Sequence, residues 1–390
     1  MNQGKYIFSQ IVTFLPARVF DRCVNTFQGD KWVKHFTCWN QLMCMIFGQL
    51  SNRDSLRDLL VCLNAHKSKH YHLGFGKSIS RSNLAEANEK RDCKIFEMFA
   101  YEMIAEAQKT CISDSDFNLS IKGNVYAFDS TTIDLCLNVF WWASFRRAKG
   151  GIKLHTLLDI KTAIPVFMYI TPASVHDVNG LDQLTYETGG YYVMDRGYID
   201  FERLSVIDQH EAFFVIRAKN NLQFIRKSAE KSDKTIGVLC DQRIALKGFY
   251  SNQSYDKEIR RVKYYDEEQN KTLIFLSNNF ALPAIEIAML YKHRWKIELF
   301  FKWIKQHLKI KSFWGASENA VKIQIYTAII TYTAVAIIKS KLKLKQSPYE
   351  ILQIMSVSLL DKTHLKELFE NTLYQDVKEQ NHIQLKINLI

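Results

Sequence analysis

Three acidic residues stand where carboxylates could act together. Asp129 ends the apolar run VYAFD, Asp195 ends the run YYVMD, and Glu298 lies within AMLYKHRWKIELFFKWIKQHLKI. The apolar residues before each aspartate predict a strand, and open α/β sheets commonly bind ligands at the carboxyl ends of their strands. Either aspartate alone is also consistent with a turn or a helix cap. Together they favour a cation site, because a pair of facing carboxylate oxygens suits Mg²⁺.

The sequence around Glu298 predicts one long helix from about Pro283 to Ile310. Projected at 100° per residue, four polar residues fall within roughly 60° of one another, and two lysines join the same stripe. The four are Tyr291, Arg294, Glu298 and Lys305, and the two lysines are Lys302 and Lys309. Bulky apolar residues such as Ile297 and Phe300 occupy a separate arc that can face a core. The polar stripe must therefore face something else.

This polar stripe has two interpretations. Glu298 could form surface pairs with Arg294 and Lys302, each four residues away and each worth about 0.2–0.5 kcal/mol. That interpretation leaves Tyr291 and the two strand-end aspartates without a role. A metal-bound phosphodiester would instead use the glutamate as a metal ligand and the cations as phosphate clamps.

The charge balance also favours a phosphate-rich partner. The chain has 390 residues, with 52 Lys and Arg against 40 Asp and Glu, and a net charge of +12 at pH 7. Because neutralised phosphates release counterions, this surplus favours nucleic acid. The pair Gly150-Gly151, where the protein backbone could approach DNA closely, is flanked by Arg146, Arg147, Lys149 and Lys153. A solvated basic loop, attraction to an acidic membrane surface or a basic protein without a special partner would show the same charges.

Composition excludes a disordered chain and favours a cytoplasmic one. Hydrophobic residues make up 47% and charged residues 24%, and the length suits two or three domains. The eight cysteines form no Cys-x-x-Cys pair, and no basic-then-apolar leader opens the sequence. The longest apolar run, 325–338, is shorter than the roughly 20 residues of a bilayer span and predicts a buried helix. Near Cys62, three histidines lack a recognisable zinc spacing and favour a basic loop.

Two hydrophobic periods divide the chain. Residues 1 to about 110 repeat apolar positions every three or four residues and predict an all-helical domain, which either enters a DNA groove or only packs. From Asn124 onward, short apolar runs predict five strands: NVYAFDSTTIDL, GIKLHTLLDI, AIPVFMYIT, YYVMD and AFFVIRAK. A hairpin at 161–163 and helices at about 180–188 and 201–209 would give the order β-β-β-α-β-α-β. A lysine-rich, strand-like stretch between Asn220 and Asn270 looks inserted before the strand KTLIFLS. The tetrapeptide SPYE at Ser347 predicts a helix start.

With these residues in order, the chain resembles a DDE transposase of a bacterial insertion sequence, specifically of insertion-sequence family four. Its Tyr-x2-Arg-x3-Glu-x6-Lys signature is matched by Tyr291, Arg294, Glu298 and Lys305. The similarity extends to AFDSTTIDL, RRAKGGIKLH, MDRGY and FFVIRAK, and covers about Val125 to Ile310. The resemblance implies an α/β fold: a ribonuclease-H-like mixed-sheet core with an inserted β subdomain, preceded by an all-helical N-terminal domain.

The resemblance and the changes of pattern together predict five segments. They are a helical N-terminal DNA-end-binding domain (1–115), the first part of the catalytic core (120–220), the inserted β subdomain (221–270), the second part of the core with the Glu-bearing helix (271–345) and a C-terminal helical segment (346–390). The C-terminal segment would either make dimer contacts or pack on the core, and packing is favoured.

The resemblance also implies the chemistry. Asp129, Asp195 and Glu298 would hold two Mg²⁺ or Mn²⁺ ions about 3.5–4 Å apart, which form the nucleophile and stabilise the leaving 3′ oxygen. Tyr291 and Arg294 would contact the phosphate near the cleaved end, and Lys305 the DNA backbone. Lys302 and the basic residues around Gly150 would add DNA contacts. The partner would be double-stranded DNA, at the element ends and at the target. We expect a homodimer when two ends are synapsed, no membrane partner, and a bacterial, nucleoid-associated location.

Three functions remain compatible with the sequence. The first is a cut-and-paste transposase that binds terminal inverted repeats, cleaves the ends and joins the 3′ hydroxyls to target DNA. The others are a catalytically inactive DNA-binding regulator derived from a transposase, and a ribonuclease-H-like nuclease without strand transfer. Some relatives stack a flipped base on a Trp of the inserted subdomain while a hairpin forms. This chain has no Trp there, so the hairpin step differs or another ring serves, chosen from Phe249, Tyr250, Tyr264 and Tyr265.

Overall fold

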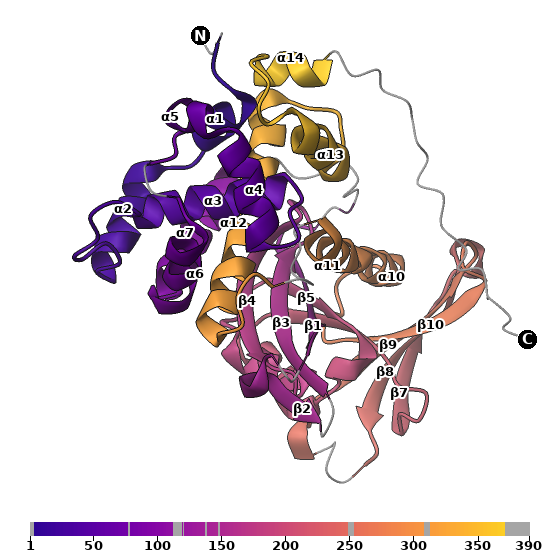
Figure 1. Cartoon of the computed structure of the whole chain (residues 1–390). Helices are drawn as coiled ribbons and strands as arrows, with labels where there is room; N and C mark the ends of the chain where they lie inside the picture. Colours follow the sequence, from indigo (N-terminus) through magenta and orange to yellow (C-terminus); the bar gives the residue numbers. More distant parts are fainter. Residues whose placement is uncertain are drawn as a thin grey trace, which may run out of the picture.

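The computed structural model describes residues 4–76, 79–111, 119, 121–136, 139–146, 149–248, 253–307 and 313–370. Its centre is a ten-stranded mixed sheet with the order β2-β3-β1-β5-β6-β10-β9-β8-β7, in which β4 also pairs with β3 (Figure 1). The strands are β1 (Val125–Leu135), β2 (Ser144–Arg146), β3 (Lys149–Asp159), β4 (Ile164–Pro172), β5 (Tyr191–Met194), β6 (Phe213–Arg217), β7 (Phe224–Glu230), β8 (Val238–Leu246), β9 (Ile259–Asp266) and β10 (Lys271–Ser277).

Five of these strands form the ribonuclease-H-like core. Strands β4, β3 and β1 are antiparallel neighbours, joined by the expected hairpin, while β1, β5 and β6 run parallel. All four residues of β5 are buried, as expected for a parallel strand covered on both faces. Helix α8 (Phe201–Gln209) connects β5 to β6, as the sequence predicts. The predicted fold class is thus confirmed.

The predicted helix at 180–188 is wrong. The chain instead forms a 3-10 helix, η3 (Asp177–Gln183), followed by a non-helical segment that leads to β5. Gly180 lies within η3, where an added Cβ would meet His155 Nδ1 at 2.7 Å and the Phe128 ring at 2.9 Å. Because η3 approaches the sheet this closely, it packs there without the layer of side chains that an α-helix would need. A second short 3-10 helix, η4 (Arg196–Tyr198), follows β5 directly.

The inserted strands extend the core sheet. β7, β8 and β9 form an antiparallel meander, β9 pairs with β10, and β10 pairs with the core strand β6. In Figure 1 these strands reach away from the helical part of the molecule. A buried ion pair lies within the meander, where Arg260 of β9 contacts Asp241 of β8 at 2.7 Å. Arg260 also donates to the carbonyls of Asn279 and Leu282, which links the meander to the segment before α10.

The N-terminal residues are helical, as predicted. The helices are α1 (Ile7–Val12), α2 (Ala17–Thr26), α3 (Cys38–Leu50), α4 (Leu56–Ala65), α5 (His70–Leu73), α6 (Arg81–Lys90) and α7 (Lys94–Thr110), with the 3-10 helix η1 (Lys67–Lys69) between α4 and α5. They surround α12 (Glu318–Leu342), which carries the long apolar run and packs on α3, α6 and α7 (Figure 1). By length and hydropathy α12 would span a bilayer, yet 89% of its apolar window is buried here. It is the predicted buried helix.

The C-terminal helices pack on the N-terminal ones. They are α13 (Pro348–Ser358), which begins with the predicted capping box at Ser347 and Glu350, and α14 (Leu365–Glu370). The amides of Ile7 and Phe8 donate to the carbonyls of Asp361 and Leu359, and Gln10 contacts both Thr363 and Leu365. Through residue 370, the C-terminal segment therefore packs within the chain.

The predicted single helix from Pro283 to Ile310 is two helices. α10 (Ala284–Lys292) ends before His293, and α11 (Trp295–His307) begins after Arg294. Three tight hydrogen bonds close the junction: Arg294 N to Tyr291 O, Lys296 N to His293 O and Ile297 N to Arg294 O. The junction contains neither Gly nor Pro, so no local signal predicts it. It divides the signature, because Tyr291 lies on α10 and Glu298 on α11.

Candidate active site

The two aspartates lie side by side at the edge where β1 and β5 meet. In the parallel pair, Phe128 lies opposite Met194, so Asp129 and Asp195 are the next residues along each strand. Asp129 Oδ1 accepts a hydrogen bond from the Ser130 amide at 2.8 Å. Asp195 Oδ1 accepts one from the Gly197 amide at 3.2 Å and so caps η4. Asp195 directly follows β5, as the sequence predicts. The prediction that Asp129 ends its strand is wrong, because β1 continues to Leu135. The parallel pairing of β1 with β5 brings the two residues together.

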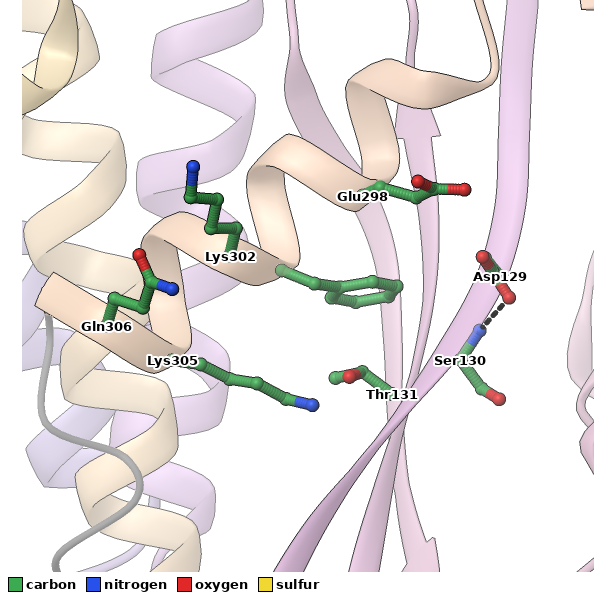
Figure 2. A pocket seen from close by; sticks show the side chains of 8 residues that line it. Asp129, Ser130, Thr131, Glu298, Lys302, Lys305 and Gln306 are labelled. Atoms are coloured by element: carbon green, nitrogen blue, oxygen red, sulfur yellow. Dashed lines mark hydrogen bonds between the residues drawn. The ribbon is translucent and has the colours of Figure 1, made fainter. Parts of the chain in front are cut away.

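Glu298 reaches the same site from α11. Figure 2 shows its carboxylate extending from the first turn of α11 toward the carboxylate of Asp129 on β1. Between α11 and β1 lies an open pocket of about 410 Å³. Its lining residues are Asp129, Ser130, Thr131, Glu298, Phe301, Lys302, Lys305 and Gln306. The pocket therefore combines two carboxylates with two lysines that were predicted to contact DNA.

Arg294, at the junction between α10 and α11, connects two of the three carboxylates. Its Nη1 lies 3.1 Å from Asp129 Oδ2, and its Nη2 donates to Glu298 Oε1. The Arg294 side chain is 15% exposed, whereas that of Glu298 is 57% exposed. The surface pair that the sequence allowed between Arg294 and Glu298 is present, but the same guanidinium also holds a carboxylate of the sheet.

Tyr291 connects the third carboxylate to the same group. Its hydroxyl donates to Asp195 Oδ2 at 3.3 Å, and its ring lies 5.7 Å from the Arg294 guanidinium. The ring also packs on Phe275 of β10, with centroids 4.8 Å apart, and is 9% exposed. The structure thus gathers Tyr291, Arg294, Glu298, Asp129 and Asp195 into one contact network.

Burial dominates the electrostatics of this network. It raises the pKa of Asp129, although the Ser130 amide, Arg294 and the Tyr198 hydroxyl all act to lower it. Burial acts to lower the pKa of Arg294, but Tyr291, Glu298 and Asp129 outweigh it, so the net shift is upward. Burial also raises the pKa of Tyr291. The guanidinium is thus held as a cation among groups that favour its charge.

The donor set suits a hard divalent cation, since all three acidic side chains offer carboxylate oxygens. In the arrangement seen here the guanidinium stands between Asp129 and Glu298 in place of such a cation. Across the described residues, no three His, Cys, Asp or Glu side chains lie together closely enough to hold an ion. This includes Cys62 and the nearby histidines, for which the basic loop was favoured. The assignment of metal ions to Asp129, Asp195 and Glu298 stays a prediction.

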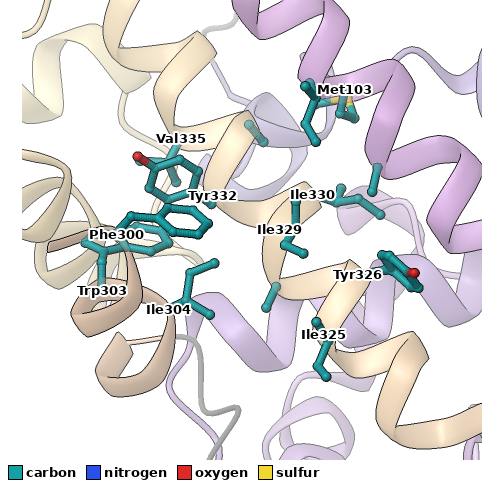
Figure 3. Packing of buried hydrophobic residues seen from close by; sticks show 14 of the residues in the cluster. Met103, Phe300, Trp303, Ile304, Ile325, Tyr326, Ile329, Ile330, Tyr332 and Val335 are labelled. Carbon is teal, nitrogen blue, oxygen red and sulfur yellow. The ribbon is translucent and has the colours of Figure 1, made fainter. Parts of the chain in front are cut away.

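The apolar face of α11 fixes the position of Glu298. Phe300 and Trp303 pack edge-on against Tyr332 of α12, with ring centroids 5.0 and 4.6 Å apart (Figure 3). Ile297 and Ile304 are also buried. Because the apolar arc of α11 is held by α12, its opposite arc faces β1, as the sequence indicates for this part of the stripe.

The remaining predicted DNA contacts differ in their surroundings. Lys302 and Lys305 line the pocket, and Lys305 extends toward Thr131 in Figure 2. Lys153 is only 12% exposed, and its Nζ binds Asp177 at 2.9 Å and the Val175 carbonyl at 2.6 Å. A contact from Lys153 to DNA would require exchange of these partners. The described part of the structure does not include the side chains of Arg146, Arg147, Lys149 and Lys309 or the rings of Phe249 and Tyr250.

Several site residues were not singled out from the sequence. The hydroxyl of Tyr198 donates to Asp129 Oδ1 at 3.3 Å, and the Ser130 hydroxyl donates to Asp177 at 2.7 Å. Thr131, Phe301 and Gln306 line the pocket. Ser130, Thr131 and Tyr198 belong to the segments AFDSTTIDL and MDRGY. Their closeness in sequence to the two aspartates is a signal that identifies them as candidate site residues. Phe301 carries no polar group, and the helical projection places it on the apolar arc with Ile297 and Phe300.

The fold is that of the ribonuclease-H-like class of proteins. Comparison with known families agrees: residues 121–334 match the transposase DDE domain, and residues 3–76 match DUF4372, a domain of unknown function. The chain therefore belongs to the transposase DDE domain family and is a metal-dependent, DNA-cleaving enzyme.

Curated relatives carry names consistent with this family. The chain is 35% identical over 264 residues to a protein of Sinorhizobium fredii named as transposase y4zB, covering 65% of this chain and 70% of that protein. It is 31% identical over 210 residues to a Geobacillus stearothermophilus protein named as a transposase for insertion sequence element IS5377, covering 52% and 54%. A Synechocystis protein named as a transposase for element IS4SA is 26% identical over 267 residues, covering 66% and 71%.

Proposed function

We propose that this transposase binds the terminal inverted repeats of its own insertion sequence, cleaves the DNA there, and joins the freed 3′ hydroxyls to target DNA. The observation that carries the proposal is the placement of Asp129, Asp195 and Glu298. Two elements of the core sheet and one distant helix bring these carboxylates to one network beside a basic pocket. Acidic oxygens beside phosphate-binding cations are what phosphodiester chemistry needs.

Asp129, Asp195 and Glu298 would together hold divalent cations. Two Mg²⁺ or Mn²⁺ ions in that position supply activation of the attacking oxygen and charge stabilisation of the leaving 3′ oxygen. Asp129 and Asp195 are fixed by the backbone amides of Ser130 and Gly197, so their carboxylates are oriented before DNA arrives. Glu298 is the most exposed of the set and can adjust its side chain to the ligand.

The pocket cations would hold the DNA strand in line for attack. Lys302 and Lys305 follow Glu298 along α11 and line the same pocket as Asp129. Tyr291 and Arg294 would take the phosphate next to the cut. The homodimer, the membership of insertion-sequence family four, and the grip of the helical N-terminal region on the inverted repeats belong to the same proposal. Under the same proposal, the protein acts on chromosomal DNA in the bacterial cytoplasm.

A cleavage assay on the element's own ends tests the proposal. Purified protein, a labelled duplex that carries the end sequence and Mg²⁺ should give strand breaks at the end, followed by joining to a second duplex. Chelation by EDTA should stop both steps. A non-catalytic regulator would bind the duplex without breaking it, and a nuclease without strand transfer would release ends that never join the second duplex.

A further inference from the structure

Arg294 holds the carboxylate oxygens that a cation would need. Asp129 Oδ1 is already occupied, since it accepts from the Ser130 amide and the Tyr198 hydroxyl. The other oxygen, Oδ2, is the one that contacts Arg294, and the same guanidinium takes Oε1 of Glu298. A cation placed between Asp129 and Glu298 would therefore compete with the guanidinium for the same oxygens.

We propose that Arg294 is a resident counter-ion of the DNA-free enzyme, which leaves the carboxylates when metal ions bind and moves to a DNA phosphate. The inference rests on the proposed function, because that function supplies both the ions and the phosphate. It assigns Arg294 a positioning role before DNA binding, in addition to the phosphate contact that the signature implies.

The surroundings of Arg294 suit a group that can exchange partners. Its Nε is buried without a hydrogen-bond partner among the described residues, so the guanidinium is incompletely satisfied where it lies. Arg294 lies at the junction between α10 and α11, and its guanidinium carbon is 5.7 Å from the centroid of the Tyr291 ring. A rotation of the side chain can thus move the guanidinium while the ring still covers it.

Phosphate is the chemical group that can replace both carboxylates. A guanidinium binds phosphate oxygens through paired hydrogen bonds as it binds carboxylates. The pocket that would receive the DNA strand begins at Asp129 and Glu298, so the phosphate would arrive beside Arg294. The exchange leaves no unpaired charge, because the cations take the carboxylates and the guanidinium takes the phosphate. Metal binding and DNA binding would consequently favour each other.

Mn²⁺ binding to the full-length, DNA-free protein tests this inference without a cleavage readout. Calorimetric titration should show that Arg294→Gln binds Mn²⁺ about tenfold more tightly than the wild type, because the competing charge-assisted hydrogen bonds are gone. Arg294→Lys, which keeps one charge but loses the forked geometry, should fall between them and also serves if the glutamine variant does not fold. The double variant Asp129→Asn, Arg294→Gln should lose the added affinity, which assigns the ion to this site.

The matched control is Lys302→Gln, which removes one positive charge from α11 and from the pocket that Asp129 and Glu298 line. If general electrostatics governed the affinity, this variant would tighten Mn²⁺ binding as much as Arg294→Gln does. Equal effects, or no gain in Arg294→Gln, would overturn the inference. The proposed function is judged separately. If the wild type cleaves the ends but Arg294→Gln shows no gain in Mn²⁺ affinity, only the counter-ion role is rejected. A gain in Mn²⁺ affinity without any end cleavage by the wild type rejects only the function.

Discussion

The hydroxyl of Tyr198 donates a hydrogen bond to Oδ1 of Asp129 at 3.3 Å. Tyr198 follows Asp195 by three residues, is 3% exposed, and packs edge-on against Phe128 with ring centroids 5.3 Å apart. The packed ring therefore holds the Tyr198 hydroxyl in place to donate to the Asp129 carboxylate. This contact links η4, which follows β5, to the middle of β1, so that the element following one aspartate orients the other.

Replacing Tyr198 with Phe should lower cleavage by about tenfold or more while DNA binding stays unchanged, because losing a partner of a metal-binding carboxylate typically costs 10–100-fold in affinity or activity. The ring packing is kept, so the free energy of unfolding should fall by only about 1 kcal/mol. Single-turnover cleavage rates and denaturant titrations measure the two effects.

The control for Tyr198→Phe is Tyr186→Phe. Tyr186 is buried and donates to the Leu181 carbonyl at 3.1 Å, away from the carboxylates. It should show a similar loss of stability with normal cleavage. An equal loss of cleavage in both variants would contradict a positioning role for Tyr198.

Asp129→Asn should remove end cleavage without destabilising the metal-free protein. Burial raises the pKa of Asp129, so between the ordinary Asp pKa and the raised one the folded state binds more protons than the unfolded state. Stability therefore falls as the pH rises through that window, and the ionised carboxylate costs stability at neutral pH. The melting temperature of the variant should equal or exceed that of the wild type at pH 7. The difference should shrink as the pH falls toward 4. A markedly lower melting temperature at pH 7 would show that the carboxylate stabilises the fold.

Arg294→Ala should weaken cleavage by about a hundredfold or more, as loss of a group that stabilises developing charge does, and DNA binding by much less. In the proposed complex only one of several phosphate contacts would disappear, but that contact is the one next to the cut. Binding by gel shift and cleavage under saturating enzyme separate the two. A variant that cleaves normally once bound would deny Arg294 any part in the reaction.

Asp241→Ala should lower the free energy of unfolding by about 3–5 kcal/mol, because it leaves the buried Arg260 guanidinium without its carboxylate. Both side chains of this pair are less than 10% exposed, and Arg260 also reaches the Leu282 carbonyl just before α10. The comparison is Lys257→Ala, which breaks an exposed pair with Asp208 and should cost at most about 1 kcal/mol. Chemical denaturation measures both, and equal small losses would contradict a stabilising role of the buried pair within the inserted strands.

The sequence predicts that the two aspartates follow apolar runs, and misses what depends on packing. Asp195 directly follows β5 as expected, whereas Asp129 lies within β1, and the pairing of β1 with β5 brings the two together. The junction at His293 and Arg294 is not predictable, because no Gly or Pro marks it. There, the Tyr291 ring is held on Phe275 while Arg294 is drawn to Asp129, and these tertiary contacts override the helical period.

Two further differences have the same physical origin. The length of the segment 180–188 suggested a connecting helix, yet the close contact of Gly180 with the Phe128 ring selects the tighter η3. The inserted stretch looked like a separate subdomain, but pairing of β10 with both β6 and β9 makes it part of the central sheet. Strand pairing between distant segments leaves no local trace in the sequence.

The most direct test of the central claim is cleavage of a duplex carrying the element's end by the wild type and by Asp129→Asn, Asp195→Asn and Glu298→Gln, with Mg²⁺ and with EDTA. We expect end cleavage by the wild type only, only with the metal, and retained DNA binding by all three variants. Full cleavage by the three variants, or cleavage by the wild type in EDTA, would contradict the claim that these carboxylates form a metal-dependent active site.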